Sequence, residues 1–193
     1  NNTFIDNNIT TNGSSAHGIR IISGALIPRN NVARRNIIIV RDGRGFDLNS
    51  THNNTLRDNI LNVSGTNGYG IYLSSSSNST ISGNLVNTSG SSGIGIYLFL
   101  DSHNNTLSSN VISTKGNYSF GISLNNTSYV IIRNNTILTN GTKGHGILLF
   151  SSLSNIISNN SILINGSNGQ GIRLDYTSGS GSNIISSNAI NTS

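Results

Sequence analysis

Charged side chains are scarce in this sequence of 193 residues: they make up 9% of the chain, and glutamate is absent. The polar surface must therefore be built from Asn, Ser, Thr and Gly. The formal charge of +5 comes from eleven basic residues against six acidic ones. Neither set forms a long stripe, so we predict no nucleic-acid partner. One local basic cluster is interpreted as a solvated edge or a contact between subunits in preference to an anion site: Arg29, Arg34, Arg35, Arg41 and Arg44.

Cysteine is also absent, which excludes disulfide bonds and thiolate metal sites. No apolar run reaches the ~18 residues that a membrane span requires, so we predict no membrane insertion. The first residues have neither an initiator methionine nor the pattern of a signal peptide. We therefore expect a processed chain or an excised segment.

A repeat of about 25 residues runs through the chain. Its most regular element is a glycine followed by an apolar residue, any residue and a second apolar residue. Copies start 25 to 27 residues apart, at Gly18, Gly45, Gly70, Gly95, Gly121, Gly146 and Gly171. The apolar spacing of two residues is the period of a β-strand. Further recurring glycines, such as Gly65 and Gly90, indicate corners that need positive φ or close backbone approach.

An asparagine also recurs once per repeat, three residues after one apolar position and two residues before another. We predict that these asparagines stack into a structural ladder in which each amide hydrogen-bonds its neighbours along the stack. The ladder comprises Asn7, Asn36, Asn59, Asn84, Asn110, Asn135, Asn160 and Asn188. Because the asparagine occurs in every repeat, a structural role is favoured over substrate binding.

Stacked repeats about 4.8 Å apart would pair each strand with its counterparts in the neighbouring turns and align the inward positions in columns. Four apolar columns are predicted, from Phe4 to Ile185, Ile9 to Ile190, Ile19 to Ile172 and Ile21 to Leu174. The predicted fold is all-β: a parallel solenoid of about seven to eight turns with three short strands per turn. Residues 1–193 are expected to form a single domain without caps of its own.

The asparagine segment, the glycine corner and the Gly-Ile-x-Leu motif together resemble the repeats of the right-handed parallel β-helix superfamily, of the pectate-lyase-like and NosD-like kinds. The resemblance covers nearly the whole chain and implies a right-handed parallel β-helix. That superfamily includes polysaccharide lyases, hydrolases and epimerases, tailspikes, surface adhesins and periplasmic accessory proteins. The resemblance therefore implies an architecture and leaves the activity open.

Polysaccharide lyases and hydrolases of this fold need clustered carboxylates, whereas the six aspartates of this chain are spread along its length. We predict no catalytic residue, no cofactor and no metal site, and hence a protein that is not an enzyme. Asp6, Arg35 and Asp58 share one repeat position and indicate an alternating salt-bridge ladder. The four histidines are interpreted as turn residues: His17, His52, His103 and His145.

Two tyrosines, Tyr72 and Tyr97, occupy the same outward position in adjacent repeats. Stacked tyrosines can form a platform for sugar rings, and cross-strand aromatic pairs also stabilise sheets without binding a ligand. Both interpretations stay open, and a carbohydrate contact is one of them. The repeat is interrupted at residues 23–31, 99–101 and 175–182, where loops are expected on one face.

Sequons for N-glycosylation are dense in this sequence, which favours an extracellular or cell-surface glycoprotein. Possible glycosylation sites are Asn8, Asn49, Asn62, Asn78, Asn87, Asn117, Asn140 and Asn165.

The function predicted from these features is that of a non-enzymatic extracellular structural protein, such as an adhesion stalk or a filament subunit. Its partners would be further copies joined head to tail, or further repeats of a longer chain, because uncapped solenoid ends expose strand edges. Glycans are a possible further partner. The alternative is a carbohydrate-binding or carbohydrate-active β-helix domain of the lyase, hydrolase or epimerase type.

Overall fold

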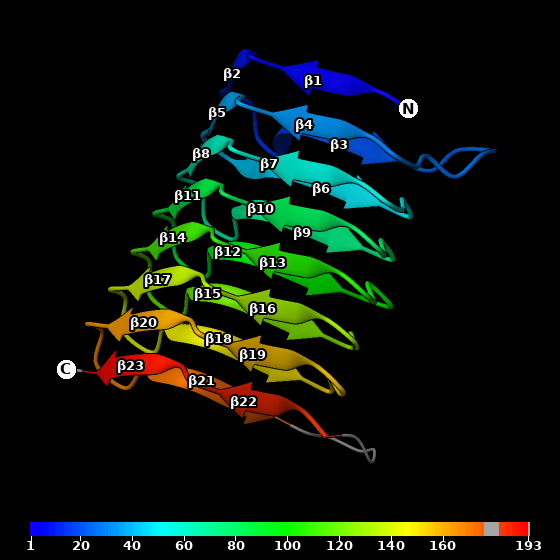
Figure 1. Ribbon diagram of the computed structural model, residues 1–193. Helices are drawn as coiled ribbons and strands as arrows, with labels where there is room; N and C mark the ends of the chain where they lie inside the picture. The colour runs from blue at the N-terminus through cyan, green and yellow to red at the C-terminus, as the bar shows by residue number, and fades with distance from the viewer. Residues whose placement is uncertain (176–181, 193) are drawn as a thin grey trace.

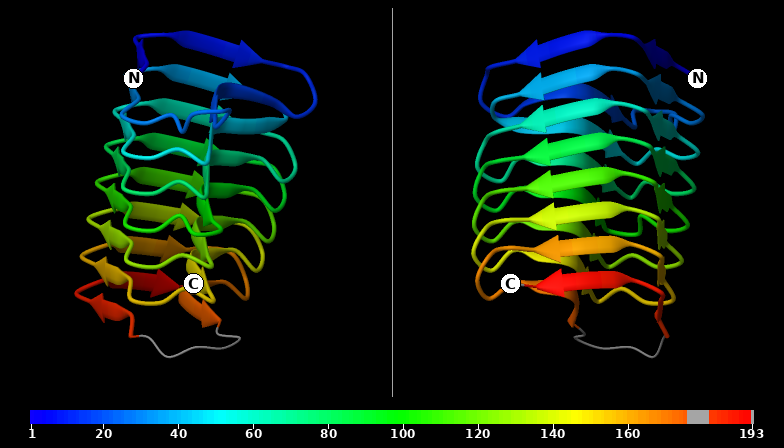
Figure 2. Two further views of the ribbon diagram at one scale, coloured as in Figure 1. Left: turned by 90° about the vertical axis from the view of Figure 1, so that its right-hand side faces the viewer. Right: turned by 60° about the vertical axis from the view of Figure 1, so that its left-hand side comes forward.

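The computed structural model describes residues 1–175 and 182–192, and its regular structure in these ranges consists of β-strands alone. The strands form three parallel sheets, each built from successive turns of the chain (Figure 1). The turns stack one above another, with the two chain termini at opposite ends of the stack (Figure 2). The predicted all-β solenoid, with about 25 residues and three short strands per turn, is confirmed.

Sheet A has eight strands: β1 (Thr3–Ile5), β4 (Val32–Arg34), β7 (Thr55–Arg57), β10 (Thr80–Ser82), β13 (Thr106–Ser108), β16 (Ile131–Arg133), β19 (Ile156–Ser158) and β22 (Ile184–Ser186). Sheet B also has eight: β2 (Asn8–Thr11), β5 (Ile37–Val40), β8 (Ile60–Val63), β11 (Leu85–Thr88), β14 (Val111–Thr114), β17 (Thr136–Thr139), β20 (Ser161–Ile164) and β23 (Ala189–Thr192). Sheet C has seven: β3 (Ala16–Ile22), β6 (Gly43–Asn49), β9 (Tyr69–Ser74), β12 (Ile94–Phe99), β15 (Phe120–Asn125), β18 (His145–Phe150) and β21 (Gln170–Asp175).

The first and last strands of each sheet have one described neighbour each. Head-to-tail association through these strands stays a prediction, as does the assignment of residues 1–193 to a single domain. The described residues contain no helix that is long and apolar enough to cross a membrane.

The corner between sheets A and B contains the asparagine ladder. From Asn7 to Asn160, each ladder asparagine donates from its backbone N–H and from its side-chain Nδ2 to Oδ1 of the next, at 2.7–3.0 Å. Nδ2 also donates its second hydrogen to a backbone carbonyl, as from Asn110 Nδ2 to Ile81 O at 3.0 Å. The amides from Asn36 to Asn160 are buried, so this pattern removes the large penalty of leaving them unpaired.

The residue before each ladder asparagine has a left-handed backbone, with φ of 54 to 65°. Only one of these eight positions, Gly83, is a glycine. The recurring glycines at the next corner, such as Gly65 and Gly90, have no positive φ, and a side chain at Gly90 would collide with the carbonyl of Gly65. Close backbone approach is therefore the reason for those glycines.

The strand glycines of sheet C are also required by close packing. A Cβ atom at Gly70 would lie 2.5 Å from the carbonyl oxygen of Gly95 and would collide with Val86. These glycines bring the strands of sheet C against sheet B.

A second polar ladder, which sequence analysis missed, lines the corner between sheets C and A. Asn31 donates from Nδ2 to Asn54 Oδ1 at 2.9 Å, and Asn155 donates to Asn183 Oδ1 at 3.1 Å. Ser79 replaces asparagine in one turn and accepts from Asn54 N at 3.1 Å. Interruption by Ser79 and, in another turn, by Val130 obscured the period of this ladder in the sequence.

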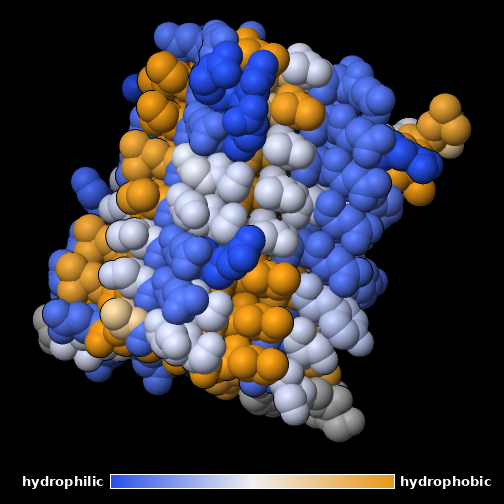
Figure 3. Space-filling view, in the orientation of Figure 1, coloured by the Kyte–Doolittle hydropathy of each residue, from blue (hydrophilic) through white to orange (hydrophobic). Residues whose placement is uncertain are grey.

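The four predicted apolar columns form the core. Near their ends Phe4, Ile9, Ile172 and Leu174 are only partly buried, and the last members of two columns, Ile185 and Ile190, are exposed. A fifth inward column in sheet B was not predicted, because it mixes apolar residues with threonine: Thr11, Val40, Val63, Thr88, Thr114, Thr139 and Ile164. The hydroxyl groups of the four threonines are buried and have no hydrogen-bond partner. Apolar side chains are also exposed on the outside of the solenoid, where several of them lie one above another (Figure 3).

Replacing Thr114 with valine should stabilise the protein by about 1 kcal/mol, because it removes a buried hydroxyl without a partner and keeps the side-chain shape. Valine already occupies the equivalent position at Val63. The reciprocal change, Val63→Thr, should destabilise by a similar amount. Thermal or denaturant unfolding would measure both, and a lower stability of Thr114→Val would contradict this account.

Replacing Asn110 with alanine should destabilise the protein by about 3 to 5 kcal/mol, because it removes several buried hydrogen bonds and leaves donors of Asn84 unpaired. The matched control is Asn62→Ala, at an exposed asparagine that pairs with Asn87, and should change stability by less than about 1 kcal/mol. Equal losses in the two variants, measured by urea denaturation, would show that the ladder has no special role.

Candidate functional site

The outer face of sheet C carries two columns of side chains, one from the residue before each strand glycine and one from the residue two after it. The first column comprises His17, Arg44, Tyr69, Ile94, Phe120, His145 and Gln170. The second comprises Arg20, Asp47, Tyr72, Tyr97, Ser123, Leu148 and Arg173. Charged residues gather towards both ends of this face, with aromatic rings between them.

Asp47 is the centre of the first charged cluster, and its side chain is 1% exposed. Arg44 donates from Nη1 to Asp47 Oδ1 at 3.0 Å. Arg20 Nε lies 3.1 Å from Asp47 Oδ2, and His17 Nε2 lies 3.4 Å from the same oxygen. Neither of these two contacts is aligned as a hydrogen bond, and Asp47 Oδ2 and His17 Nδ1 are buried without a hydrogen-bond partner. The pairing of adjacent strands β3 and β6 brings the four side chains together from two turns.

Aromatic rings extend the cluster along the solenoid axis. The guanidinium group of Arg44 lies over the ring of Tyr72, 3.7 Å from its centroid, and 5.5 Å from that of Tyr69. Tyr69 packs edge-on against Tyr97 at 5.3 Å, and Tyr97 packs against Phe99 at 5.7 Å. Such cation–π and aromatic contacts hold the arginine in a fixed orientation.

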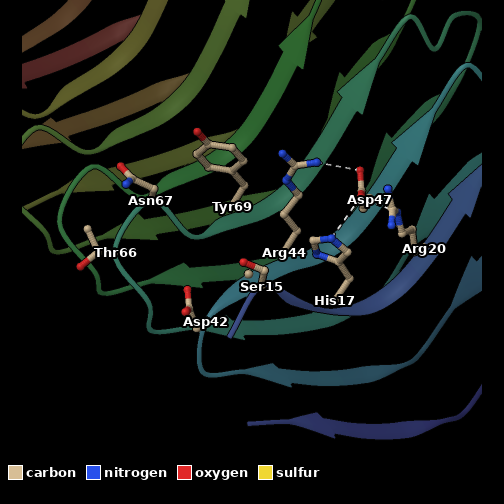
Figure 4. Close-up of a pocket in the computed structure, with 10 residues that line it drawn as sticks. Ser15, His17, Arg20, Asp42, Arg44, Asp47, Thr66, Asn67 and Tyr69 are labelled. Atoms are coloured by element: carbon tan, nitrogen blue, oxygen red, sulfur yellow. Dashed lines mark hydrogen bonds and ion pairs between the residues drawn. The ribbon is translucent and has the colours of Figure 1, made fainter. Parts of the chain in front are cut away.

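An open pocket of about 500 Å³ lies over this cluster and is lined by residues from β3, β6 and β9 and from the corners before them. Its lining includes His17, Arg20, Arg44, Asp47 and Tyr69. Figure 4 shows His17 and Arg44 reaching towards Asp47, with Tyr69 beside Arg44. We call this depression the Asp47 pocket.

Burial sets the protonation of two groups in the Asp47 pocket. It lowers the pKa of His17 below its ordinary value; Asp47 opposes this shift, while Arg44 and Arg20 add to it. Burial raises the pKa of Tyr69, against a smaller opposing effect of Arg44. At neutral pH the pocket therefore presents a neutral imidazole and a protonated phenol next to two fixed guanidinium groups.

The two tyrosines predicted as a possible carbohydrate platform both lie at this site, but they are not equally accessible. Tyr72 is 8% exposed, because Arg44 covers its ring. Tyr72 therefore offers no free flat face. Tyr97 is partly exposed, and Tyr69, which sequence analysis missed, lines the pocket.

The sequon asparagines lie at the surface: Asn87 is partly exposed and the other seven are exposed. Some of them pair across turns, since Asn87 Nδ2 donates to Asn62 Oδ1 and Asn165 Nδ2 to Asn140 Oδ1, each at 2.9 Å. Their glycosylation stays a prediction.

The alternating salt-bridge ladder forms in part. Arg35 makes two hydrogen bonds to Asp6, each at 2.7 Å, whereas Asp58 pairs with Arg57 at 3.1 Å. His52 and His103 occupy turns, where Nδ1 of each accepts a backbone N–H from the next turn. The interpretation of His17 and His145 as turn residues is wrong, because these two histidines lie within strands β3 and β18. Within residues 1–175 and 182–192, the structure contains no group of three or more His or Asp side chains that could hold a metal ion.

The model of the family described as "Right handed beta helix region" matches residues 61–193, which is more than half of the chain. The protein therefore belongs to the right-handed β-helix family, and the predicted superfamily is confirmed. No curated protein matches the chain.

Two solved structures are similar to the chain. One is a point mutant of the periplasmic alginate epimerase AlgG, with 14% identity and a TM-score of 0.46 over 99% of this chain and 58% of that one. The other is the A-module of the mannuronan C-5 epimerase AlgE4 from Azotobacter vinelandii, with 16% identity and a TM-score of 0.36 over 91% of this chain and 61% of that one. The chain thus spans about three fifths of each structure, and likeness at this level describes the fold alone.

The prediction that the protein is not an enzyme is corrected here: it relied on the spread of the six aspartates along the sequence, and the two similar solved structures are both named as epimerases. The physical reason for the error is that clustered carboxylates were sought along the sequence. The Asp47 pocket instead combines one carboxylate with His17, Arg20 and Arg44, which strand pairing brings together from two turns.

Acidification should destabilise the folded protein through His17 and His145, since burial lowers the pKa of each below its ordinary value of 6.5. Just below that value the unfolded chain binds more protons than the folded chain, so stability falls as the pH falls. The double variant His17→Gln/His145→Gln should lose less stability than the wild type between about pH 7.5 and 5.5. Thermal unfolding across this range would test it, and identical pH dependence in the two proteins would refute it.

Proposed function

We propose that this protein is a carbohydrate-active β-helix domain that binds an acidic polysaccharide along the outer face of sheet C and acts on it at the Asp47 pocket. The supporting observation is the placement of Arg20, Arg44 and Tyr69 around a buried aspartate beside a neutral histidine. The chemical class that fits is a polymer of uronic acids, which offers both carboxylates and sugar rings.

The two arginines keep capacity to bind a carboxylate. Arg20 faces Asp47 through Nε and Arg44 through Nη1, so the remaining N–H groups of each guanidinium are available to a ligand. Their side chains are 53% and 29% exposed. The partly exposed ring of Tyr97 lies next along the axis, where the apolar face of a sugar can pack on it.

The proposed reaction begins with removal of the proton on the carbon next to the uronate carboxylate. The C–H bond breaks, the proton moves to the imidazole of His17, and the electron pair spreads onto the carboxylate held by the arginines. Return of a proton to that carbon from the Tyr69 hydroxyl epimerises the sugar. In the other outcome the neighbouring glycosidic oxygen leaves with the proton of the Tyr69 hydroxyl, which breaks the chain and leaves a double bond. In both cases the proton held by His17 then passes through solvent to the Tyr69 phenolate and restores the site. Both outcomes share the first step.

The test is incubation of the protein with polymannuronate and polygalacturonate in heavy water. Incorporation of deuterium next to the carboxylate, followed by NMR, reports the shared first step, and ultraviolet absorbance of an unsaturated product reports lysis. His17→Ala should slow deuterium incorporation at least about 100-fold, and Asp47→Asn should slow it as well.

Asp101→Asn is the matched control, because Asp101 is an exposed aspartate outside the pocket. It should keep the wild-type rate. Absence of deuterium incorporation in the wild type, or full activity in His17→Ala, would overturn the proposed reaction.

An extracellular or cell-surface location is part of this proposal, since a polymer substrate would be met outside the cell. Glycans at Asn62 and Asn87 would project from sheet B and leave the outer face of sheet C free. Association with further copies or further repeats through the solenoid ends would extend the same face along the axis.

A further inference from the structure

A second open pocket, of about 570 Å³, lies towards the other end of the same face of sheet C. It is lined by Tyr118, Phe120, Lys143, His145, Asn168 and Arg173, from β15, β18 and β21 and the corners before them. His145 belongs to the same column as His17, and Arg173 to the same column as Arg20. We call it the Arg173 pocket.

Two hydrogen-bond donors face each other in the Arg173 pocket. His145 Nδ1 accepts the backbone N–H of Gln170 at 3.1 Å, so the neutral ring carries its proton on Nε2. That Nε2 lies 3.2 Å from Nη1 of Arg173, which is also a donor. An anionic oxygen placed against both groups would accept from each and relieve this mismatch.

Neighbouring residues hold these two donors in place. Asp175 binds Arg173 through Nε and Nη2, at 2.9–3.0 Å, and leaves Nη1 on the side of His145. The His145 ring stacks on Phe120 with centroids 5.4 Å apart, and its side chain is largely buried. Lys143 Nζ lies 3.3 Å from the hydroxyl of Tyr118 and adds a second positive charge to the pocket.

The chemistry of the pocket favours a carboxylate over a neutral sugar. Among the residues that the structure describes, its lining contains Lys143 and Arg173 and no acidic residue, and Asp175 can neutralise one of the two cations. Burial, and then Arg173, lowers the pKa of His145, so the ring is neutral at neutral pH and donates a hydrogen bond without adding charge.

We propose that the Arg173 pocket is a second anion-binding site that takes a carboxylate of the same acidic polysaccharide whose reacting unit occupies the Asp47 pocket. This inference rests on the proposed function and adds a binding site remote from the reaction. Arg20 and Arg173 stand six strand steps apart in one column, which is about 29 Å at 4.8 Å per step. A polymer laid along the solenoid axis would pass over Tyr97 and reach both pockets.

Binding at two linked sites makes affinity depend on ligand length, because the second contact is intramolecular once the first has formed. A uronate disaccharide can occupy one pocket at a time, whereas an oligomer longer than the span can occupy both. The experiment is therefore calorimetric titration of the full chain with a uronate disaccharide and with a long uronate oligomer. A neutral glucan oligomer of equal length serves as the ligand control.

The variants are Arg173→Gln and Lys143→Gln in the second pocket and Arg20→Gln in the first. Arg133→Gln is the matched control, because Arg133 is an exposed arginine on sheet A and the substitution removes the same charge. Circular dichroism would verify that each variant folds. Lys143→Gln changes an exposed residue and leaves the ion pair between Arg173 and Asp175 intact.

Arg173→Gln and Lys143→Gln should each weaken binding of the long oligomer about tenfold or more and leave the rate of deuterium incorporation into a disaccharide unchanged. Arg20→Gln should weaken binding of both ligands, and Arg133→Gln should change neither. If the second-pocket variants bind the long oligomer as tightly as the wild type does, the second site is overturned while the proposed function stands. If the wild type binds no uronate of either length, the proposed function itself fails.

Discussion

The hydrogen bonds between successive turns are the constraint on which the rest of this structure depends. They join every strand to its counterparts in the neighbouring turns and thereby set the axial spacing of about 4.8 Å. The asparagine ladder applies the same constraint to a corner, where no strand pairing is available. Each ladder amide is satisfied only when the turns on both sides are in register, so the ladder links the order of one turn to that of the next.

Because the turns are in register, each position of the repeat becomes a line of side chains parallel to the axis. Inward lines are aliphatic and form the core, and outward lines are free to vary. On sheet C two such lines run side by side and carry most of the unusual chemistry of the chain. Asp47 is buried on this outer face because Arg20, Arg44 and His17 surround it, and without the two guanidinium groups a buried carboxylate would be costly.

Much of the fold could be predicted from the sequence. The spacing of the strand glycines, the apolar period of two and the recurring asparagines indicated the number of turns, the three strands per turn and the core columns. Prediction was less accurate where different residue types serve one structural purpose. The left-handed corner residues, for example, include Asp6, Ser109 and Asn134, and only Gly83 is a glycine. The fifth core column was not predicted because polar and apolar residues, such as Thr114 and Val63, occupy equivalent positions in it, so it has no constant apolar character.

The sequence by itself determined the repeat, the strand period and the ladder, because these depend on residues that recur at a fixed interval and interact with their own counterparts. The tertiary structure alone decided what the outer face of sheet C contains. His17 and Asp47 occupy different positions of the repeat in different turns, and only the register of β3 with β6 brings them together. Likewise, the ring of Tyr72 points outward as its position indicates, yet it is covered by Arg44 from the turn before. Contacts between unlike positions depend on side-chain reach and packing across turns, and a periodic pattern carries no information about either.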